Sequence, residues 1–336
     1  MKTLISVLFW MTLTAAPAKA QNVAVRNLAQ KLGYGPEAKL LIGHLEDLGS
    51  VRSANLAARH ALDHGVAMSG SVMTPGPSVA SVPELLGDLA GLDLGIHVTM
   101  TIEDSRVWKP AADPKLIPSL VDAKGNLARN PFGLFLWGNP KQIAIETEAQ
   151  IQTAMAMGIR PTHLDTHMGT AFFKPSWLES YLNLARKYRL APMVPRWSEG
   201  IANFLGPLSG VAQFYVKPLL DQIEAAGFLL LDDFYIFPFP AKDEGYEVRK
   251  QKYINMIRNL KPGVTEVVLH PAYADDEFMR QILVEGSGLW VRDHEARLLV
   301  DPEIARILAE EGVRLIGWRE IQRAYDWDRV SEVSFR

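Results

Sequence analysis

The chain has 336 residues, with 35 lysines and arginines against 38 aspartates and glutamates, for a formal net charge of −3. Because both signs are mixed along the chain, its charge gives no electrostatic reason to expect nucleic acid or an anionic membrane surface as a partner. The sequence contains no cysteine, which excludes disulfides and thiolate ligands. Any metal would therefore have to be held by histidine and carboxylate side chains.

The first twenty residues have the features of a secretory signal peptide. Lys2 gives a basic start, residues 4–13 are apolar, and Ala18-Lys19-Ala20 has the small-x-small pattern of a signal-peptidase site. We expect residues 1–20 to be removed, leaving an exported chain, periplasmic or secreted, that begins at Gln21. An uncleaved N-terminal anchor is the alternative. No later stretch is long and apolar enough for a transmembrane helix.

Short apolar runs alternate with helix-like stretches along nearly the whole chain, which is typical of βαβ units and a largely parallel sheet. Eight strands are expected near residues 40–44, 66–73, 92–99, 162–166, 191–195, 228–232, 264–270 and 313–318. Helices are expected over 54–64 and 141–157, each closed by a glycine. Because no repeat or linker divides residues 21–336, we predict a single domain there.

Two stretches lack helical or strand periodicity and are predicted to be loops, residues 101–139 and residues 198–210. Long loops in compact domains are usually functional or disordered. The first of them contains four aromatic residues, which favours a substrate-facing flap over disorder. These aromatic residues are Trp108, Phe132, Phe135 and Trp137.

Nearly every expected strand ends, on its C-terminal side, in residues that can carry chemistry. In chain order these are His44, Glu46 and Asp47, then His97, Asp165 and His167, Arg196, Asp232 and Asp233, His270, and Trp318 with Arg319. Active sites of parallel α/β folds form at this end, because the loops that follow the strands converge there. Taken singly, a histidine is more often a hydrogen-bonded or exposed residue, and Glu46 or Asp47 could cap the next helix.

Capping does not explain why histidines end three different strands, and a metal site fits the whole set. Histidine and carboxylate side chains bind zinc and similar divalent ions, and a water on such a metal becomes a nucleophile near neutral pH. By contrast, His60 and His64 lie four apart on a helix but lack the glutamate of a zinc-protease motif. We interpret those two as surface or capping residues.

Four stretches resemble the YdjC/ChbG-type carbohydrate deacetylases, distant relatives of the polysaccharide deacetylases. They are LIGHLEDLG (41–49), GIHVT (95–99), PTHLDTH (161–167) and LHPA (269–272). The third stretch is the most specific, and the likeness runs from about residue 39 to about residue 320. The usual opening motif of the family, Asn-Ala-Asp-Asp-Phe-Gly, is matched here by residues 44–49, with His44 in place of Asn and Glu46 in place of the first Asp.

The resemblance implies a distorted (βα)7-8 barrel with its active site at the C-terminal ends of the strands. It also implies one divalent metal, which we expect to be zinc, with magnesium, manganese, nickel or cobalt as alternatives. Glu46 is the implied general base, His270 the general acid, and Arg196 a substrate-binding residue. The implied metal ligands are Asp47, His97 and His167.

Strand alternation adds a role for one further residue. His163, Asp165 and His167 lie on the same face of their strand. If that face points into the barrel, Asp165 can contact and orient a metal ligand without binding the metal itself. We interpret His163, deeper along the strand, as a core histidine.

These observations together predict a metal-dependent hydrolase that removes an N-acetyl group from an amino sugar or oligosaccharide. Two alternatives stay open. One is another metallohydrolase of envelope material, either an amidase or a phosphoesterase, although a phosphate substrate would favour more basic residues than Arg196 alone. The other is a non-catalytic carbohydrate-binding relative.

Overall fold

The computed structural model describes residues 27–102, 107–129, 131–240, 243–274 and 288–335. The predicted signal peptide, residues 1–20, lies outside the described residues. Among the helices in these ranges, none combines the length and the apolar character that crossing a membrane requires.

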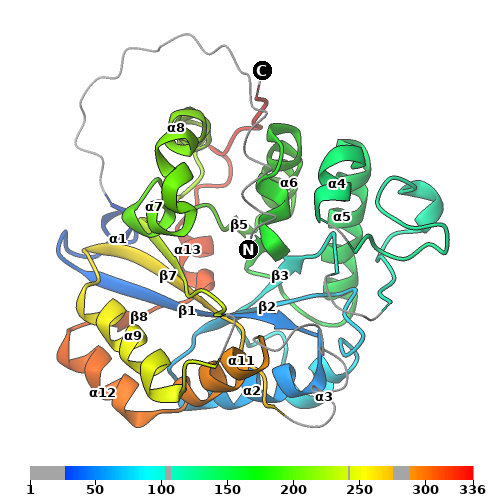
Figure 1. Ribbon diagram of the computed structural model, residues 1–336. Coiled ribbons are helices and arrows are strands. Elements are labelled where there is room, and N and C mark those ends of the chain that lie inside the picture. The colour runs from blue at the N-terminus through cyan, green and yellow to red at the C-terminus, as the bar shows by residue number, and fades with distance from the viewer. Residues whose placement is uncertain (1–26, 103–106, 130, 241–242, 275–287, 336) are drawn as a thin grey trace.

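A parallel sheet forms the centre of the structure (Figure 1). Its hydrogen-bonded strand order is β5-β4-β3-β2-β1-β7-β6, and β8 pairs with β1. Each pairing is parallel. The strands are β1 (Lys39–Leu48), β2 (Ser69–Val72), β3 (Leu94–Val98), β4 (His163–Thr166), β5 (Ala191–Pro192), β6 (Asp233–Ile236), β7 (Gly263–Leu269) and β8 (Arg314–Leu315).

The sheet curves into a distorted barrel, as expected. An isolated parallel bridge joins Pro195, just beyond β5, to Leu231, just before β6, and so connects the two ends of the strand order. All strands of a parallel barrel point the same way, so the segments that follow β1, β3, β4 and β7 converge at one end.

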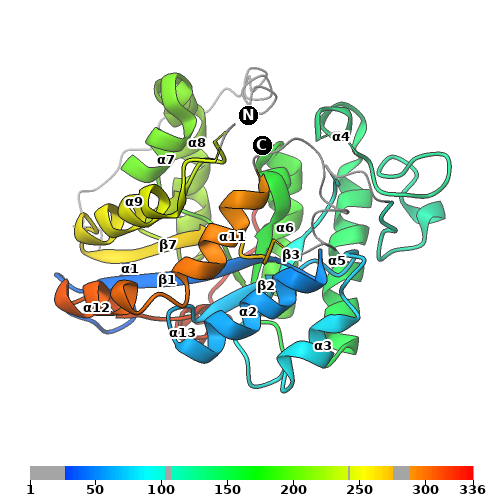
Figure 2. The same cartoon turned by 60° about the horizontal axis from the view of Figure 1, so that its bottom comes forward.

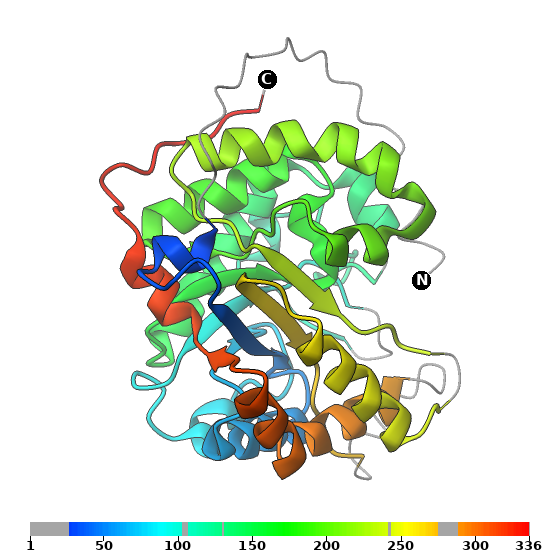
Figure 3. The same ribbon diagram turned by 90° about the vertical axis from the view of Figure 1, so that its left-hand side faces the viewer.

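Helices cover the outside of the sheet, and in Figure 3 the strands lie between two groups of them. Helix α5 packs beside α6, α9 beside α11 and α12, and α2 beside α11 (Figure 2). The α-helices are α1 (Leu28–Lys31), α2 (Arg52–His64), α3 (Ser81–Leu86), α4 (Pro131–Trp137), α5 (Pro140–Ala156), α6 (Pro175–Tyr188), α7 (Glu199–Leu205), α8 (Ser209–Ala225), α9 (Tyr246–Arg258), α11 (Gly288–Leu298), α12 (Pro302–Glu310) and α13 (Trp318–Ala324). Short 3-10 helices are η2 (Pro114–Leu116), η3 (His167–Phe172) and η4 (Gly206–Leu208).

Most predicted elements are present, but the sixth strand was predicted in the wrong place. Phe228, Leu230 and Leu231 of the predicted strand are buried without belonging to a strand, and the strand-type pairing of Leu231 is an isolated bridge to Pro195. The ladder with β7 starts one residue later, where Asp233 pairs with Thr265. Burial alone therefore explains the apolar run, and an apolar pattern cannot distinguish a buried connection from a strand.

The prediction of loop structure over residues 198–210 was wrong, because this stretch contains α7, η4 and the start of α8. Ser198 caps α7 by accepting a hydrogen bond from the backbone N–H of Ile201 at 3.2 Å. Gly206 and Pro207 interrupt the helical pattern between α7 and α8, which explains its loop-like appearance.

The other predicted loop, residues 101–139, contains η2 and α4. Its aromatic residues do not share one environment. Trp108 is buried in a small cluster with Met73, Ile102 and Leu127, whereas the side chain of Trp137 is 76% exposed. Trp108 therefore stabilises the loop from inside, and Trp137 is the aromatic residue of this stretch that faces solvent most fully.

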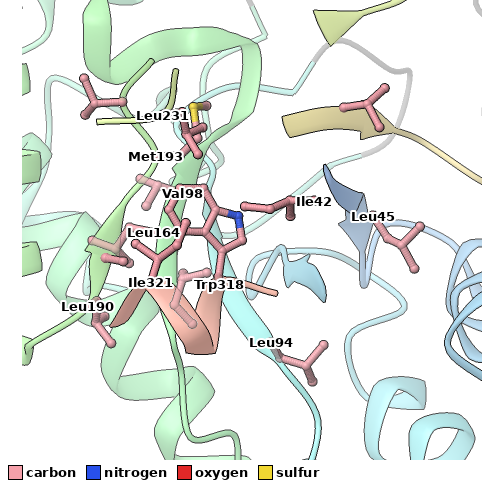
Figure 4. Packing of buried hydrophobic residues seen from close by; sticks show 14 of the residues in the cluster. Ile42, Leu45, Leu94, Val98, Leu164, Leu190, Met193, Leu231, Trp318 and Ile321 are labelled. Atoms are coloured by element: carbon pink, nitrogen blue, oxygen red, sulfur yellow. The ribbon is translucent and has the colours of Figure 1, made fainter. Parts of the chain in front are cut away.

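The main core cluster draws on residues from Leu28 to Val333, nearly the whole described chain. Figure 4 shows Trp318, at the start of α13, among apolar side chains that include Ile42, Leu164 and Met193. The indole N–H of Trp318 donates to Oε1 of Glu266 at 2.7 Å. The hydrogen bond satisfies the polar atom of this buried ring.

Gly95 is required by the packing of a histidine on the neighbouring strand. A Cβ at Gly95 would overlap the imidazole ring of His163, which is fully buried and stacks on Trp318 with ring centroids 5.2 Å apart. Burial and the nearby His44 hold the pKa of His163 well below its ordinary value. His163 is therefore the neutral core histidine that the sequence predicted.

We predict that Gly95→Ala destabilises the protein by about 1–3 kcal/mol, since the added methyl must displace a tightly packed ring. The matched control is Gly35→Ala, because no atom lies within 4 Å of a Cβ at that position. Urea unfolding of both variants measures the difference. Equal stability of Gly95→Ala and the parent protein would contradict this explanation of the glycine.

Candidate metal centre

The end of β1 carries two neighbouring acidic residues in an unusual backbone geometry. Asp47 has a φ of 65°, in the left-handed region that residues other than glycine rarely adopt. The register between β1 and β2 also shifts between Leu45 and Leu48. The turn is held by Ser50, whose backbone N–H and hydroxyl both donate to the carbonyl of Asp47, at 3.1 and 2.6 Å. Strain of this kind gathers at functional sites.

Asp47, His97 and His167 lie together, although they come from the ends of β1, β3 and β4. Oδ1 of Asp47 is 3.4 Å from Nε2 of His97 and 3.6 Å from Nδ1 of His167. The two ring nitrogens are 3.3 Å apart. Zinc bonds of about 2.0–2.1 Å in a tetrahedral site imply ligand separations of about 3.3 Å. The three atoms therefore have the spacing of a metal-binding triad.

Hydrogen bonding supports the same interpretation of this triad. Oδ1 of Asp47 is buried and has no hydrogen-bond partner. A buried carboxylate oxygen without a partner is costly, and such atoms in native proteins call for an explanation. A cation bound between Asp47 and the two histidines would supply the missing interaction, so the residues present fit a divalent metal.

The charges around His97 favour a cation as well. Burial opposes protonation of His97, but Asp165 and Glu46 raise its pKa well above the ordinary value, with a further contribution from Asp47. Three carboxylates thus surround one imidazole in a buried setting. A divalent cation would balance this excess of negative charge.

Asp165 orients His97 toward the other two residues of the triad. Its Oδ1 lies 2.7 Å from Nδ1 of His97, and its Oδ2 lies 2.7 Å from Nε2 of His44. Because Nδ1 of His97 donates to Asp165, Nε2 is the ring nitrogen that faces the triad, where a bound cation would replace its proton. This is the position that the sequence predicted for a residue that orients a ligand.

Two other groups of histidines and carboxylates have the composition of a metal site, namely His44, His163 and Asp165, and Glu46, His97 and Asp165. Both include Asp165, whose two oxygens already accept short hydrogen bonds from His97 and His44. The Asp47 triad has separations of 3.3, 3.4 and 3.6 Å and an oxygen without a hydrogen-bond partner, so it is the better candidate.

His167 opens the triad to solvent. It begins η3, where Met168 and Gly169 have φ values of 55° and 65°. The His167 side chain is 16% exposed, against 1% for His97. The left-handed turn thus ends β4 at the histidine and leaves one side of the triad accessible.

Glu46 and His270 form the second part of the site. Oε2 of Glu46 lies 3.2 Å from Nε2 of His270 and 3.8 Å from Nε2 of His97. His270 follows β7, and its backbone N–H donates to Oε2 of Glu295 at 2.7 Å. Glu295 is itself buried in an ion pair with Arg249. The carboxylate and the imidazole predicted as base and acid therefore lie beside each other next to the triad.

The sequence profile of the YdjC-like protein family matches residues 40–310. The chain belongs to this family. A carbohydrate deacetylase of Thermus thermophilus is 31% identical over 311 residues, which cover 89% of this chain and 99% of the relative. A carbohydrate deacetylase of Thermoanaerobacter pseudethanolicus is 27% identical over 284 residues, covering 83% and 98%. The resemblance found in the sequence is confirmed.

Solved structures support the fold. A protein of Enterococcus faecalis, described as a candidate cellobiose-phosphate cleavage protein, superposes with a TM-score of 0.65 at 24% identity. The match covers 84% of this YdjC-like chain and 99% of the other. It shows that the two proteins share the fold over the matched part of this chain.

Arg196, the residue predicted to bind substrate, pairs with acidic residues outside the triad. The guanidinium of Arg196 donates to Glu224 at 2.7 Å and lies 3.5 Å from Asp232. No hydrogen bond or ion pair recorded within the described ranges joins Arg196 to the triad, to Glu46 or to His270. Its role in substrate binding stays a prediction.

Arg292 on α11 is the cation that reaches the site, and the sequence analysis missed it. Its Nη2 donates to Oδ2 of Asp47 at 2.7 Å. Burial alone would raise the pKa of Asp47, but Arg292 and the two histidines of the triad hold it well below the ordinary value. Oδ2 is therefore occupied by Arg292, which leaves Oδ1 as the atom that faces the histidines.

We predict that Arg292→Met destabilises the metal-free protein by roughly 3–5 kcal/mol at neutral pH, because Asp47 then becomes a buried charge without its partner. In the parent protein the lowered pKa of Asp47 adds stability above its unfolded pKa, and this contribution is lost as the pH falls through the folded pKa. In the variant the carboxyl takes up a proton more readily. The difference between the two proteins should therefore shrink as the pH falls from neutral to about 4.

Urea unfolding in the presence of a chelator measures this difference. Arg306→Met is the control, since Arg306 is 56% exposed in its ion pairs, and a change there should stay within about 0.5 kcal/mol. A loss in Arg292→Met that is the same at every pH would show that Asp47 is not the group that Arg292 stabilises.

Proposed function

We propose that this protein is a metal-dependent carbohydrate N-deacetylase that hydrolyses the amide bond of an N-acetylated amino sugar or oligosaccharide. The observation that carries the proposal is the buried Oδ1 of Asp47, which has no hydrogen-bond partner and faces Nε2 of His97 and Nδ1 of His167. Carbohydrate deacetylases that are similar over more than four fifths of the chain support the substrate class. We expect zinc to be the native ion, with magnesium, manganese, nickel and cobalt as the alternatives.

When bound, a divalent metal would polarise the acyl oxygen and lower the pKa of a water molecule. Glu46 lies beside the triad and is 8% exposed, so it can accept the proton of the attacking water. His270 can donate a proton to the nitrogen as the carbon–nitrogen bond breaks. Because the side chains of Glu46 and His270 are 3.2 Å apart, a proton can pass from one to the other during one turnover, as the overall reaction requires.

Export is part of the proposal. A signal peptide over residues 1–20 would bring the enzyme to the periplasm or outside the cell, where oligosaccharides and envelope glycans carry N-acetyl groups. Arg196 and the exposed Trp137 are the residues that we assign to contacts with more distant parts of the substrate.

Metal binding is tested with His167→Ala and His97→Ala. Each should lower the bound divalent metal from about one ion per chain to a trace, because two protein ligands hold such an ion poorly. His60→Ala is the matched control, since His60 is a histidine of α2 that bonds to Tyr273 outside the site. Elemental analysis after dialysis gives the metal content. Full metal content in both variants would exclude the triad.

Catalysis is tested with Glu46→Gln on a panel of N-acetylated sugars and oligosaccharides. Loss of the general base should lower kcat by about 10²–10⁴-fold while the metal content stays at the parent value. Glu46→Asp, which keeps the carboxylate, should retain part of the activity. Acetate release is the readout. Bound metal without acetate release by the parent protein would instead favour another metallohydrolase, and the absence of both would favour a binding protein.

A further inference from the structure

We propose that His44 is a positioning residue of the metal centre and acts on the ligand His97 through Asp165. The inference rests on the proposed metal-binding role of the Asp47 triad. His44 lies on β1, Asp165 on β4 and His97 on β3, so the three side chains form one buried row across the barrel.

His44 has no contact with solvent, and both of its ring nitrogens have partners. Nδ1 lies 2.9 Å from the hydroxyl of Ser69, and Nε2 lies 2.7 Å from Oδ2 of Asp165 and 3.1 Å from the hydroxyl of Ser71. Both serines come from β2. The ring is therefore fixed at two points by one neighbouring strand, and it reaches the carboxylate from a rigid position.

Asp165 depends on His44 for one of its two oxygens. Oδ1 accepts from His97, and the hydrogen bond recorded at Oδ2 is the one from His44. Both oxygens of this buried carboxylate therefore lie 2.7 Å from an imidazole nitrogen. If one of these donors is removed, a buried acceptor is left without a partner, which is unfavourable.

The orientation of His97 follows from this arrangement. A carboxylate fixed at Oδ2 keeps Oδ1 in line with Nδ1 of His97, so that Nδ1 keeps its hydrogen and Nε2, the nitrogen that would bind a metal, faces Asp47. Without His44, Oδ2 of Asp165 lacks a donor, and the carboxylate must rotate to reach another one. His97 then loses the hydrogen-bond partner that fixes its tautomer. Partners of this kind affect metal affinity by about 10–100-fold.

Other groups around His44 do not replace this function. Oε1 of Glu266 is 3.9 Å from Nδ1 of His44 and accepts from Trp318. The ring of His163 contacts that of His44 edge to face, with centroids 4.9 Å apart. Neither group has a recorded hydrogen bond to Asp165 among the described residues.

The experiment compares three variants of the full chain by competition with a chromophoric zinc chelator. His44→Leu should bind zinc about 10–100-fold more weakly than the parent protein. His44→Gln, whose side-chain amide can still donate to Oδ2, should restore the affinity to within about 3-fold. His163→Leu is the matched control, because it removes a buried histidine of the same barrel that has no recorded bond to Asp165, and it should also stay near the parent affinity.

A second readout uses the metal-free protein. The hydrogen bond between Nδ1 of His97 and Asp165 should give a downfield ring N–H resonance, assigned by its loss in His97→Gln. It should persist in His44→Gln and His163→Leu and disappear or broaden in His44→Leu. A merely structural role of His44 would leave this resonance in place in every folded variant.

The inference is overturned if His44→Leu keeps both its zinc affinity and the resonance. It is also overturned if His44→Gln or His163→Leu loses as much affinity as His44→Leu, since the effect would then come from packing and not from the donor to Asp165. If the parent protein binds no metal, the proposed function fails. The resonance still tests the link from His44 to His97 in that case.

Discussion

The carboxylate of Asp165 connects the interior of the barrel to the candidate metal centre, and the geometry of that site depends on it. Asp165 accepts from a histidine at each oxygen, with Nε2 of His44 and Nδ1 of His97 both at 2.7 Å. This contact is set by strand register, because His97 and Asp165 are paired residues of β3 and β4. A slip of one residue would turn Asp165 to the opposite face of the sheet. The precision of the ligand geometry is therefore a consequence of the parallel ladder.

Titratable residues can be buried inside this barrel because few of them are charged and the charged ones are paired. Burial raises the pKa of Glu266 to about 8, so at neutral pH this carboxyl is mostly protonated while it accepts from Trp318. Burial keeps His163 neutral. What remains is ionised Asp165 between two histidines, and an unpaired buried charge is avoided. Below the site the barrel thus holds few charges, although Nε2 of His163 and Oε2 of Glu266 are buried without a hydrogen-bond partner. The acidic excess is confined to the end where Glu46 and Asp47 lie.

The sequence predicted the parts of the site that depend on strand ends and on alternation. His163, Asp165 and His167 repeat every second residue, so their common face follows from the pleat. The barrel brings the ends of β1, β3 and β4 together.

Arg292 could not be predicted in this way, because an arginine on an outer helix usually faces solvent. The partners of Arg196 could not be predicted either, because Glu224 and Asp232 are distant from it in sequence and belong to no motif. The misplaced sixth strand has a similar cause, because burial in a connection and burial in a ladder give the same apolar pattern.

The acidic pair shows why local backbone geometry decides the chemistry. Neighbouring residues of a regular strand point to opposite faces, so Glu46 and Asp47 should not share one site. They do so because the register shifts between Leu45 and Leu48 and Asp47 adopts a left-handed conformation. Asp47 then reaches both histidines of the triad, and Glu46 reaches His97 and His270. The backbone strain at Asp47 thus lets the proposed ligand Asp47 and the proposed base Glu46 point in different directions while both side chains stay next to the same imidazole.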